Sequence, residues 1–303
     1  MKKVLVIAGP TAAGKTAFSL RCAREFNAEI ISGDSIQVYR GMDIGSGKVT
    51  AEEMGDIPHH LIDILEPDEP YSVSDFQKAV RHEIDTADGL RIICGGTGLY
   101  LKACLYDYEF LPEEETEGQD ASLAQYSTEE LYRLLQETDP VQAEKIHPNN
   151  RRRIERTLTI YRRTGQRQSD IVARQEHRML YDAFIAGCTM PRDVLYARIN
   201  ARVEGMFENG LEEEVRGLLA RGIGFDAPGM KGIGYREWQS YFQGECTREE
   251  VKEAIQKNSR HFAKRQYTWL NHQMPVHWFD ITDSEDTDRI LKEIRTWYGQ
   301  HCI

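Results

Sequence analysis

The segment Gly9–Thr16 constrains the fold most, because it reads G-P-T-A-A-G-K-T and fits the phosphate-binding pattern G-x-x-x-x-G-K-[S/T] in full. An apolar run, Val4–Ala8, precedes it, and a helix-competent stretch, Thr16–Phe26, follows it. In such a strand–loop–helix setting, backbone N–H groups and the helix N-terminus surround an anion. Lys15 can reach a terminal phosphate, and the Thr16 hydroxyl can hold Mg²⁺. The sequence therefore predicts a site for a di- or triphosphate.

Strand and helix signals alternate along the chain, which predicts an α/β fold: a P-loop NTPase-like parallel sheet flanked by helices. Strands are predicted over 4–8, 28–32, 59–65, 90–94, 182–188 and 276–279. Helices are predicted over 16–26, 72–87, 127–136, 150–163, 191–208, 210–221, 232–243 and 247–270, with one more at the C-terminus.

Residues 108–126 are acidic and poor in apolar side chains, which is typical of a linker or a surface segment. A strand pattern resumes at 182. We therefore expect a discontinuous catalytic core, 1–107 and 182–303, with a smaller helical insertion domain over 108–181.

Composition is that of an ordinary globular protein, with 40% hydrophobic and 29% charged residues in 303. No apolar run approaches the ~20 residues of a membrane span, and the six cysteines form no C-x-x-C pair. We therefore expect a cytoplasmic protein without a membrane partner. We also expect a monomer. The net charge of −11 hides two opposite clusters: acid between Glu109 and Asp120, and base between Arg151 and Arg167.

Asp34 follows the predicted second strand, at the edge of the sheet where ligands of open α/β proteins bind. Three roles are open for its carboxylate on position alone. It could cap a local turn, support a bound Mg²⁺, or act as a general base.

Three further groups have a functional and a structural interpretation. The Gly95–Gly98 turn places Thr97 where it could contact a ligand or cap the next helix, and Arg198 and Arg202 share one helix face that could bind an anion or be solvated. His59, His60 and Asp63 are interpreted as structural rather than as metal ligands, because they lie in an alternating strand pattern.

Arg151, Arg152, Arg153 and Arg156 lie at the start of a helix, where cations are unfavourable, so an RNA backbone would explain them. Basic residues also alternate with aromatic ones over 257–269, as in proteins that stack bases. A solvated face remains the alternative for both groups, in the second case over a core stripe of Ile255, Phe262 and Trp269.

Eight segments, taken in order, closely resemble the bacterial tRNA dimethylallyltransferases, also called the tRNA isopentenyltransferase family. They are GPTAAGKT at 9–16, DSIQVY at 34–39, RGMDIGSGK at 40–48, GGTGLY at 95–100, HPNNRRRIERTL at 147–158, RVEGMFENGLEEEV at 202–215, GMKGIGYRE at 229–237 and FAKRQYTWL at 262–270. This family joins the dimethylallyl group of dimethylallyl diphosphate to N6 of the adenosine 3′ to the tRNA anticodon. The acidic segment 108–126 is shorter than is usual in the family, which predicts a reduced insertion domain.

The resemblance implies a role for each matching residue. Asp34 would be the general base on N6, and Lys15, Thr16 and Arg202 would assist catalysis at the diphosphate, with Thr16 near Mg²⁺. The diphosphate-binding residues would be Gly9, Pro10, Thr11, Ala12, Ala13, Gly14, Lys15 and Thr16. The tRNA-binding residues would be Asp34, Ser35, Ile36, Gln37, Thr97, Arg152, Arg153, Ile154, Glu155, Arg156, Lys231, Gly232, Ile233, Gly234, Tyr235 and Arg236.

An ATP-dependent small-molecule kinase that uses the same P-loop is the alternative function. The sequence shows no clear Walker B strand and no N-K-x-D motif, so the loop need not serve nucleotide hydrolysis. A kinase also gives the basic inserted segment no role. A third possibility is an RNA-binding regulator with a vestigial P-loop.

Overall fold

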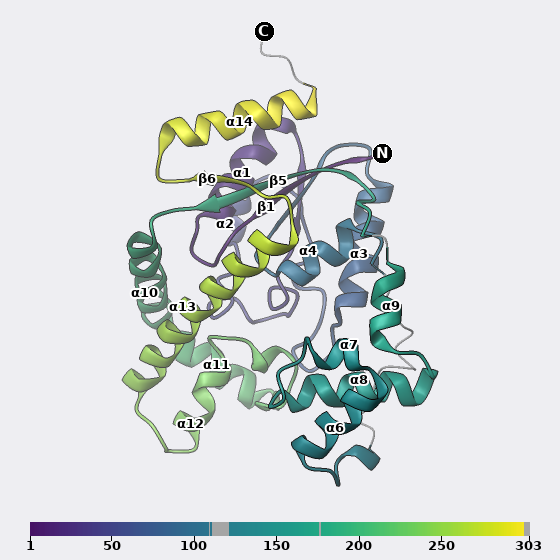
Figure 1. Ribbon diagram of the computed structural model, residues 1–303. Coiled ribbons are helices and arrows are strands. Elements are labelled where there is room, and N and C mark those ends of the chain that lie inside the picture. Colours follow the sequence, from purple (N-terminus) through teal and green to yellow (C-terminus); the bar gives the residue numbers. More distant parts are fainter. Residues whose placement is uncertain (109, 111–120, 176, 300–303) are drawn as a thin grey trace. The chain divides into compact units, whose positions relative to one another are not determined.

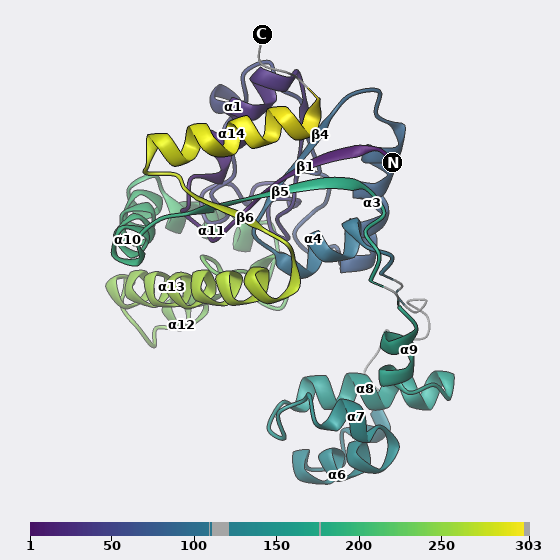
Figure 2. The ribbon, with the colours of Figure 1, turned by 45° about the horizontal axis from the view of Figure 1, so that its top comes forward.

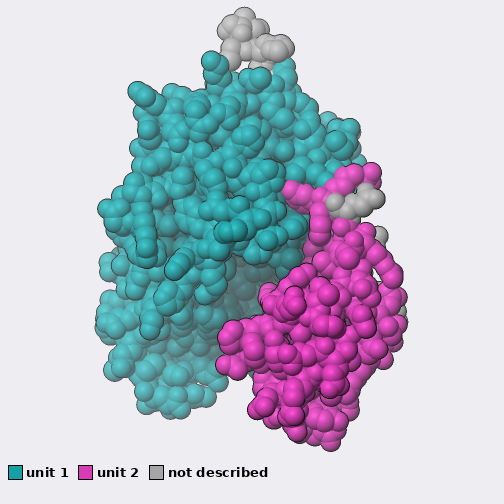
Figure 3. Space-filling model, in the orientation of Figure 1, with its two compact units in different colours: residues 1–105, 179–303 teal, residues 106–178 magenta. Residues whose placement is uncertain are grey.

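A computed structural model describes residues 1–108, 110, 121–175 and 177–299 of the chain. The chain divides into two compact units, coloured separately in Figure 3. Unit 1 comprises Met1–Leu105 and Met179–Ile303, and unit 2 comprises Tyr106–Arg178. The predicted linker and the predicted shortening of the insertion fall largely on 109 and 111–120, outside the described residues.

Unit 1 is built on a six-stranded sheet in which every pairing is parallel, in the order β3-β2-β4-β1-β5-β6. The strands are β1 (Lys3–Ala8), β2 (Glu29–Ser32), β3 (His59–His60), β4 (Arg91–Gly95), β5 (Asp182–Thr189) and β6 (His277–Asp280). The predicted parallel α/β fold is confirmed, and five of the six strands end within one residue of their predicted limits.

The strand predicted over 59–65 is wrong beyond His60. Leu61 and Asp63 have φ values of 60° and 55°, which extended backbone does not allow. This segment bonds instead to the chain after β2. The Asp63 amide donates to the Gln37 carbonyl at 3.2 Å, and the Ile64 amide donates to the Val38 carbonyl at 2.9 Å. This segment is therefore a loop bonded to the chain after β2, in which Leu61 is buried and Ile64 is exposed.

Helices cover both faces of the sheet, and Figure 2 shows α1 and α14 on one face with α4 and α13 on the other. Apolar residues of α1 and α14, such as Phe18 and Ile290, share one buried core with Leu5 and Ile7 of β1. The helices of unit 1 are α1 (Lys15–Phe26), α2 (Ala51–Met54), α3 (Val73–Thr86), α4 (Gly98–Leu105), α10 (Arg192–Glu208), α11 (Leu211–Ala220), α12 (Gln239–Phe242), α13 (Arg248–Gln273) and α14 (Ser284–Tyr298), which Figure 1 places along the chain.

The continuous helix predicted over 232–243 is also wrong. The chain there forms short 3₁₀ turns at Gly229–Lys231 and Arg236–Trp238 before α12 begins. Gly234 has φ of 100°, which a helix does not allow, and its amide donates to the Glu237 carboxylate at 2.9 Å. This irregular backbone lines a cavity described below.

Unit 2 is helical, with α6 (Thr128–Thr138), α7 (Pro140–Ala143), α8 (Arg151–Thr164) and α9 (Gln168–Arg174), preceded by a 3₁₀ turn at Ala121–Leu123. A capping box opens α6: the Ser127 side chain accepts from the Glu130 amide, and the Glu130 carboxylate accepts from the Ser127 amide. Leucines and isoleucines of α6 and α8 form a core of their own, which includes Leu131, Leu135, Ile154 and Leu158.

Three loops that carry predicted site residues leave the carboxyl ends of neighbouring strands. The P-loop follows β1, Asp34 follows β2 and Thr97 follows β4. Strands β1 and β2 are not direct neighbours, because β4 pairs with both. Thr97 therefore follows the strand that separates the P-loop from Asp34. Among the described helices, none is long and apolar enough to span a membrane.

Candidate active site

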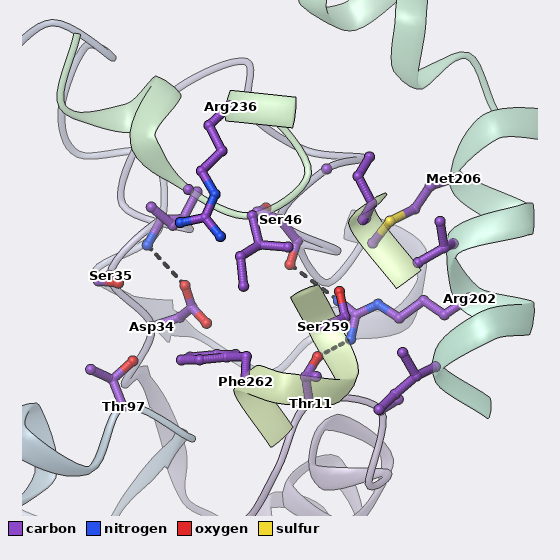
Figure 4. A pocket seen from close by; sticks show the side chains of 18 of the residues that line it. Thr11, Asp34, Ser35, Ser46, Thr97, Arg202, Met206, Arg236, Ser259 and Phe262 are labelled. Carbon is purple, nitrogen blue, oxygen red and sulfur yellow. Dashed lines mark hydrogen bonds between the residues drawn. The ribbon is translucent and has the colours of Figure 1, made fainter. Parts of the chain in front are cut away.

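Two of the cavities in unit 1 share two lining residues. The larger, which we call the acceptor cavity, has a volume of about 340 Å³ and is lined by residues that include Thr11, Asp34, Thr97, Arg202, Arg236 and Phe262 (Figure 4). The smaller, which we call the P-loop cavity, has a volume of about 270 Å³ and is lined by Ala12, Gly14, Lys15, Thr16, Arg198 and Arg202. Ala12 and Arg202 line both cavities, so the two adjoin at these residues.

The P-loop cavity has the chemistry of an anion site. Lys15 and Thr16 begin α1, and Arg198 and Arg202 reach the cavity from one face of α10. Three cationic side chains and a helix N-terminus favour a ligand with several negative charges.

Lys15 is held inside this loop. Its Nζ donates to the Pro10 carbonyl at 2.7 Å. Burial lowers the pKa of Lys15 below its usual value of 10.5, because the charged amine has lost water and the Asp34 carboxylate offsets that loss only in part. A phosphate oxygen at this position would restore the lost stabilisation of the ammonium group.

Asp34 lines the acceptor cavity with one of its two carboxylate oxygens fixed. Oδ1 accepts a hydrogen bond from the Ile36 amide at 2.8 Å, which orients the side chain as a local turn cap does. No described residue bonds Oδ2. Figure 4 shows the carboxylate on the same side of the cavity as Thr97, with Arg202 and Thr11 on the other side. The carboxylate is therefore oriented and still has proton-accepting capacity toward the cavity.

Arg202 lies at the junction of the two cavities. Its Nη1 donates to Thr11 Oγ1 at 3.2 Å, and its Nη2 donates to the carbonyls of Ser46 and Gly47 at 3.1 and 3.4 Å. A guanidinium has five N–H donors, so two remain without an acceptor among the described residues. Burial lowers the pKa of Arg202 and the Asp34 carboxylate raises it, and the side chain stays charged because its usual pKa is 12.5.

Gln266, from α13, joins two of the loops that form the acceptor cavity. Its Oε1 accepts from the Thr11 amide at 2.9 Å, and its Nε2 donates to the Gly96 carbonyl at 2.9 Å. The side chain is buried, so both amide groups are satisfied by the protein alone. The P-loop and the Thr97 loop are thus tied to the same helix.

The structure brings some of the expected tRNA-binding residues into the acceptor cavity and leaves others outside it. Those that line it are Asp34, Ser35, Ile36, Thr97, Lys231, Gly232, Ile233 and Arg236. Gln37 is not part of this lining; it accepts from Ser32 Oγ at 3.0 Å and donates to the Gly47 carbonyl at 3.4 Å. The Tyr235 ring is fully buried, and the Gly234 amide bonds Glu237, so neither offers that group to a ligand.

In unit 2, Arg152, Arg153 and Arg156 are exposed on α8, and no ion pair to another described residue occupies them. Ile154 lies in the core of the unit, and Glu155 accepts from Arg151 Nε at 2.7 Å. Of the residues of α8 expected to contact tRNA, these three arginines therefore present exposed charged groups.

Sequence reasoning did not assign Phe262 and Ser259 to the site. Both lie on α13 and line the acceptor cavity, where Figure 4 labels them together with Asp34. Sequence analysis allowed Phe262 a place in a core stripe with Ile255. A spacing of three or four residues among Ile255, Ser259 and Phe262 does show one helix face, but it does not tell a core face from a cavity wall.

The two histidines of β3, His59 and His60, bond other residues of the protein. His60 bonds the carboxylates of Glu29 at 2.7 Å and Glu83 at 3.0 Å, and His59 Nδ1 bonds the Ile57 carbonyl at 2.8 Å. Over the described part of the chain, no group of three His, Cys, Asp or Glu side chains could hold a metal ion.

A parallel sheet with a lysine- and threonine-bearing P-loop after its first strand, next to a cavity lined by arginines, places the chain in the class of P-loop proteins. The family model described as IPP transferase matches residues 37–273, and the one described as isopentenyl transferase matches residues 2–63. The chain belongs to the IPP transferase family.

Relatives and solved structures agree with this assignment. The chain is 46% identical to a tRNA dimethylallyltransferase of Anoxybacillus flavithermus, over 97% of this chain and 95% of the relative. It is 47% identical to one of Bacillus anthracis over the same shares. A crystal structure of a tRNA isopentenylpyrophosphate transferase from Staphylococcus epidermidis is 39% identical, with TM-score 0.72, over 98% of this chain and 100% of that chain.

A eukaryotic dimethylallyltransferase acting on tRNA is 26% identical, with TM-score 0.87, over 100% of this chain and 81% of that chain. None of these proteins is named as a kinase, so the alternative considered from the sequence gains no support.

Proposed function

We propose that this protein transfers the dimethylallyl group of dimethylallyl diphosphate to N6 of the adenosine 3′ to the anticodon of tRNA. The observation that carries the proposal is the pair of adjoining cavities. One offers three cations and a P-loop, the other offers a carboxylate, and Arg202 lines both. Such a pair suits a reaction in which an anionic leaving group departs on one side and a proton on the other.

The diphosphate would bind in the P-loop cavity. Lys15 and Arg202 would stabilise the charge that develops as the bond between the allyl carbon and the diphosphate oxygen breaks. Arg198 reaches the same cavity from the next turn of α10 and would bind the outer phosphate. The free N–H donors of Arg202 are the ones available for this contact.

The adenine would enter the acceptor cavity, whose volume lies within the range of about 300–1,000 Å³ usual for ligand pockets. A base in an anticodon loop has to be extruded to reach such a pocket. Asp34 Oδ2 would accept the N6 proton as the N6–carbon bond forms, and the Phe262 ring would stack on the base. Thr97, Lys231 and Arg236 would hold the nucleotides around it.

Mg²⁺ fits the P-loop cavity through one protein ligand, the Thr16 hydroxyl at the start of α1. Because the described residues offer no cluster of three metal-binding side chains, diphosphate oxygens and water would supply the other positions, a coordination that suits this ion. When bound, Mg²⁺ offsets negative charge on the diphosphate.

The exposed arginines of α8 would bind the phosphates of the anticodon stem. We further propose that the protein acts as a monomer in the cytoplasm, where its tRNA substrate is found. A sedimentation velocity measurement with and without tRNA tests the oligomeric state.

The test of function is a reaction of the purified protein with tRNA, dimethylallyl diphosphate and Mg²⁺, followed by digestion to nucleosides and mass analysis. We expect dimethylallyl adenosine, with no requirement for ATP and no ATP hydrolysis. Lys15→Ala should lower the amount of dimethylallyl adenosine formed at early time points, because a charge-assisted contact to the diphosphate is lost. ATP turnover independent of tRNA would indicate a kinase, and tight tRNA binding without any product would indicate a regulator.

A further inference from the structure

The loop at residues 43–47, which carries the carbonyl acceptors of Arg202, is itself held by the side chain of Glu214. This glutamate lies on α11, one short connection after the helix that carries Arg202. Its Oε2 accepts from the amides of Asp43 and Ile44 at 2.9 and 2.8 Å, and its Oε1 accepts from the Gly45 amide at 3.1 Å. A single carboxylate thus binds three successive backbone N–H groups, as a bound anion would.

Tyr235 completes this contact. Its hydroxyl donates to Glu214 Oε1 at 2.7 Å and accepts from the Ser46 amide at 3.2 Å. Burial, followed by the adjacent Glu214 charge, raises the pKa of Tyr235 well above its usual value, so the hydroxyl keeps the proton that it donates. The amides of residues 43–46 all point to the Glu214–Tyr235 pair.

The opposite side of the same loop contacts Arg202. The Ser46 and Gly47 carbonyls accept from its Nη2, a contact that Figure 4 shows for Ser46. A Cβ at Gly47 would lie 1.7 Å from Nη2, and a Cβ at Gly45 would lie 2.5 Å from the Tyr235 ring. Gly45 and Gly47 therefore let the loop pass between Tyr235 and Arg202. Its amides face the Glu214–Tyr235 pair, and the Ser46 and Gly47 carbonyls face Arg202.

We infer that Glu214 is a positioning residue for Arg202: by fixing the amides of the 43–47 loop, it aims the carbonyls that orient the guanidinium at the junction of the two cavities. This inference rests on the proposed function for the role of Arg202 at the diphosphate. It assigns a task to a carboxylate that touches neither cavity.

Glu214→Gln tests the inference with almost no change of volume. The four hydrogen bonds to Glu214 are divided two and two between its oxygens. A glutamine has only one oxygen, so its NH₂ group must face either the Asp43 and Ile44 amides or the Gly45 amide and the Tyr235 hydroxyl, and at least one backbone N–H then loses its acceptor. The matched control is Glu213→Gln, which makes the same change at the preceding, exposed position of α11.

The first measurement is calorimetric titration with inorganic diphosphate and Mg²⁺, which does not depend on prenyl transfer. We expect Glu214→Gln to weaken binding by about tenfold and Glu213→Gln to leave it unchanged. In the double variant with Arg202→Ala, binding should be no weaker than in Arg202→Ala alone, because Glu214 acts through that arginine. Losses that multiply, or wild-type binding by Glu214→Gln, would overturn the inference.

The second measurement is the turnover of dimethylallyl diphosphate with saturating tRNA. A guanidinium displaced by about 1 Å lowers such rates by up to ~10²-fold, so kcat should fall while the KM for tRNA stays near that of the wild type. A lower unfolding midpoint alone, with kcat and diphosphate affinity intact, would show a merely structural role and refute the inference. If the wild type transfers no prenyl group, the proposed function fails and the diphosphate titration still decides the role of Glu214.

Tyr235→Phe answers the same question if Glu214→Gln does not fold. It removes one hydroxyl and keeps the three backbone bonds to Glu214, so the loop loses only the Ser46 tether. We expect a smaller loss of diphosphate affinity, about threefold, that again disappears in the Arg202→Ala background. An equal loss in both backgrounds would contradict the inference.

Discussion

Asp34→Asn separates the three roles that the sequence left open for this carboxylate. The Asp34 Oδ1 accepts the Ile36 amide at 2.8 Å, and an asparagine oxygen can accept the same bond. The substitution therefore keeps the local turn and removes only the ability of the second oxygen to take a proton. If Asp34 is the general base, kcat should fall by roughly 10²–10⁴-fold.

The affinities for tRNA and for dimethylallyl diphosphate should stay near those of the wild type, because neither shape nor hydrogen-bonding reach has changed much. Single-turnover mass analysis with saturating substrates gives the rate, and titration gives both affinities. Asp34→Ala adds the loss of the bond to Ile36, about 1 kcal/mol of unfolding free energy. Asp56→Asn, at an exposed position, controls for the loss of one negative charge.

Two outcomes would refute the reasoning. If extra Mg²⁺ restores part of the activity and the diphosphate affinity is lowered, Asp34 supports the metal. If kcat is nearly unchanged and only the unfolding midpoint moves, Asp34 serves local structure alone.

Three further predictions concern other parts of the site. Because burial lowers the pKa of Lys15 and anion binding requires its charged form, diphosphate affinity should fall as the pH rises through a value below 10.5, and Lys15→Arg should flatten this profile in titrations at several pH values. Replacing Arg152, Arg153 and Arg156 by alanine should lower the slope of log K against log salt for tRNA by about 0.9 for each lost phosphate contact; an unchanged slope would mean a solvated face. Phe262→Ala should raise the KM for tRNA by roughly 10- to 100-fold if the ring stacks on a base, because such stacking contributes ~1–3 kcal/mol. A lower free energy of unfolding without a change in KM would instead assign Phe262 to the core.

The sheet could be predicted from the sequence because its strands are buried on both faces. Val4–Ala8, Leu90–Cys94 and Asp182–Cys188 are short, mostly apolar runs, and the apolar residues at the centre of each are buried. Strands covered on both faces of a parallel sheet have continuous apolar sequences, so local composition and tertiary structure agree.

The errors arose where the backbone takes conformations that composition does not encode. Leu61 and Asp63 interrupt a strand pattern with positive φ, although neither is glycine. Gly234 interrupts the helix predicted over 232–243: its φ is positive, and its amide bonds the Glu237 side chain three residues later. Both loops owe their shape to specific hydrogen bonds, which a period of apolar residues does not reveal.

The site was predictable in its residue types and less so in its arrangement. The P-loop motif pointed to Lys15 and Thr16 directly. Phe262 was missed because a helix face that lines a cavity has the same spacing as one that lines a core. Arg202 lines both cavities because the fold brings α10 to the P-loop. Arg202 and Thr11, which it bonds, are 191 residues apart in the sequence.

Gln266 has a consequence for how the protein acquires activity during synthesis. Its two bonds connect residues separated by 255 positions, to Thr11, and by 170 positions, to Gly96. The P-loop leaves the ribosome first, yet the bond from its Thr11 amide to Gln266 can form only after most of the chain has emerged. Contacts of such long range form late, after local helices and neighbouring strands. A nascent chain that ends before α13 would therefore carry the complete P-loop sequence without the two bonds by which Gln266 ties the P-loop to the Thr97 loop.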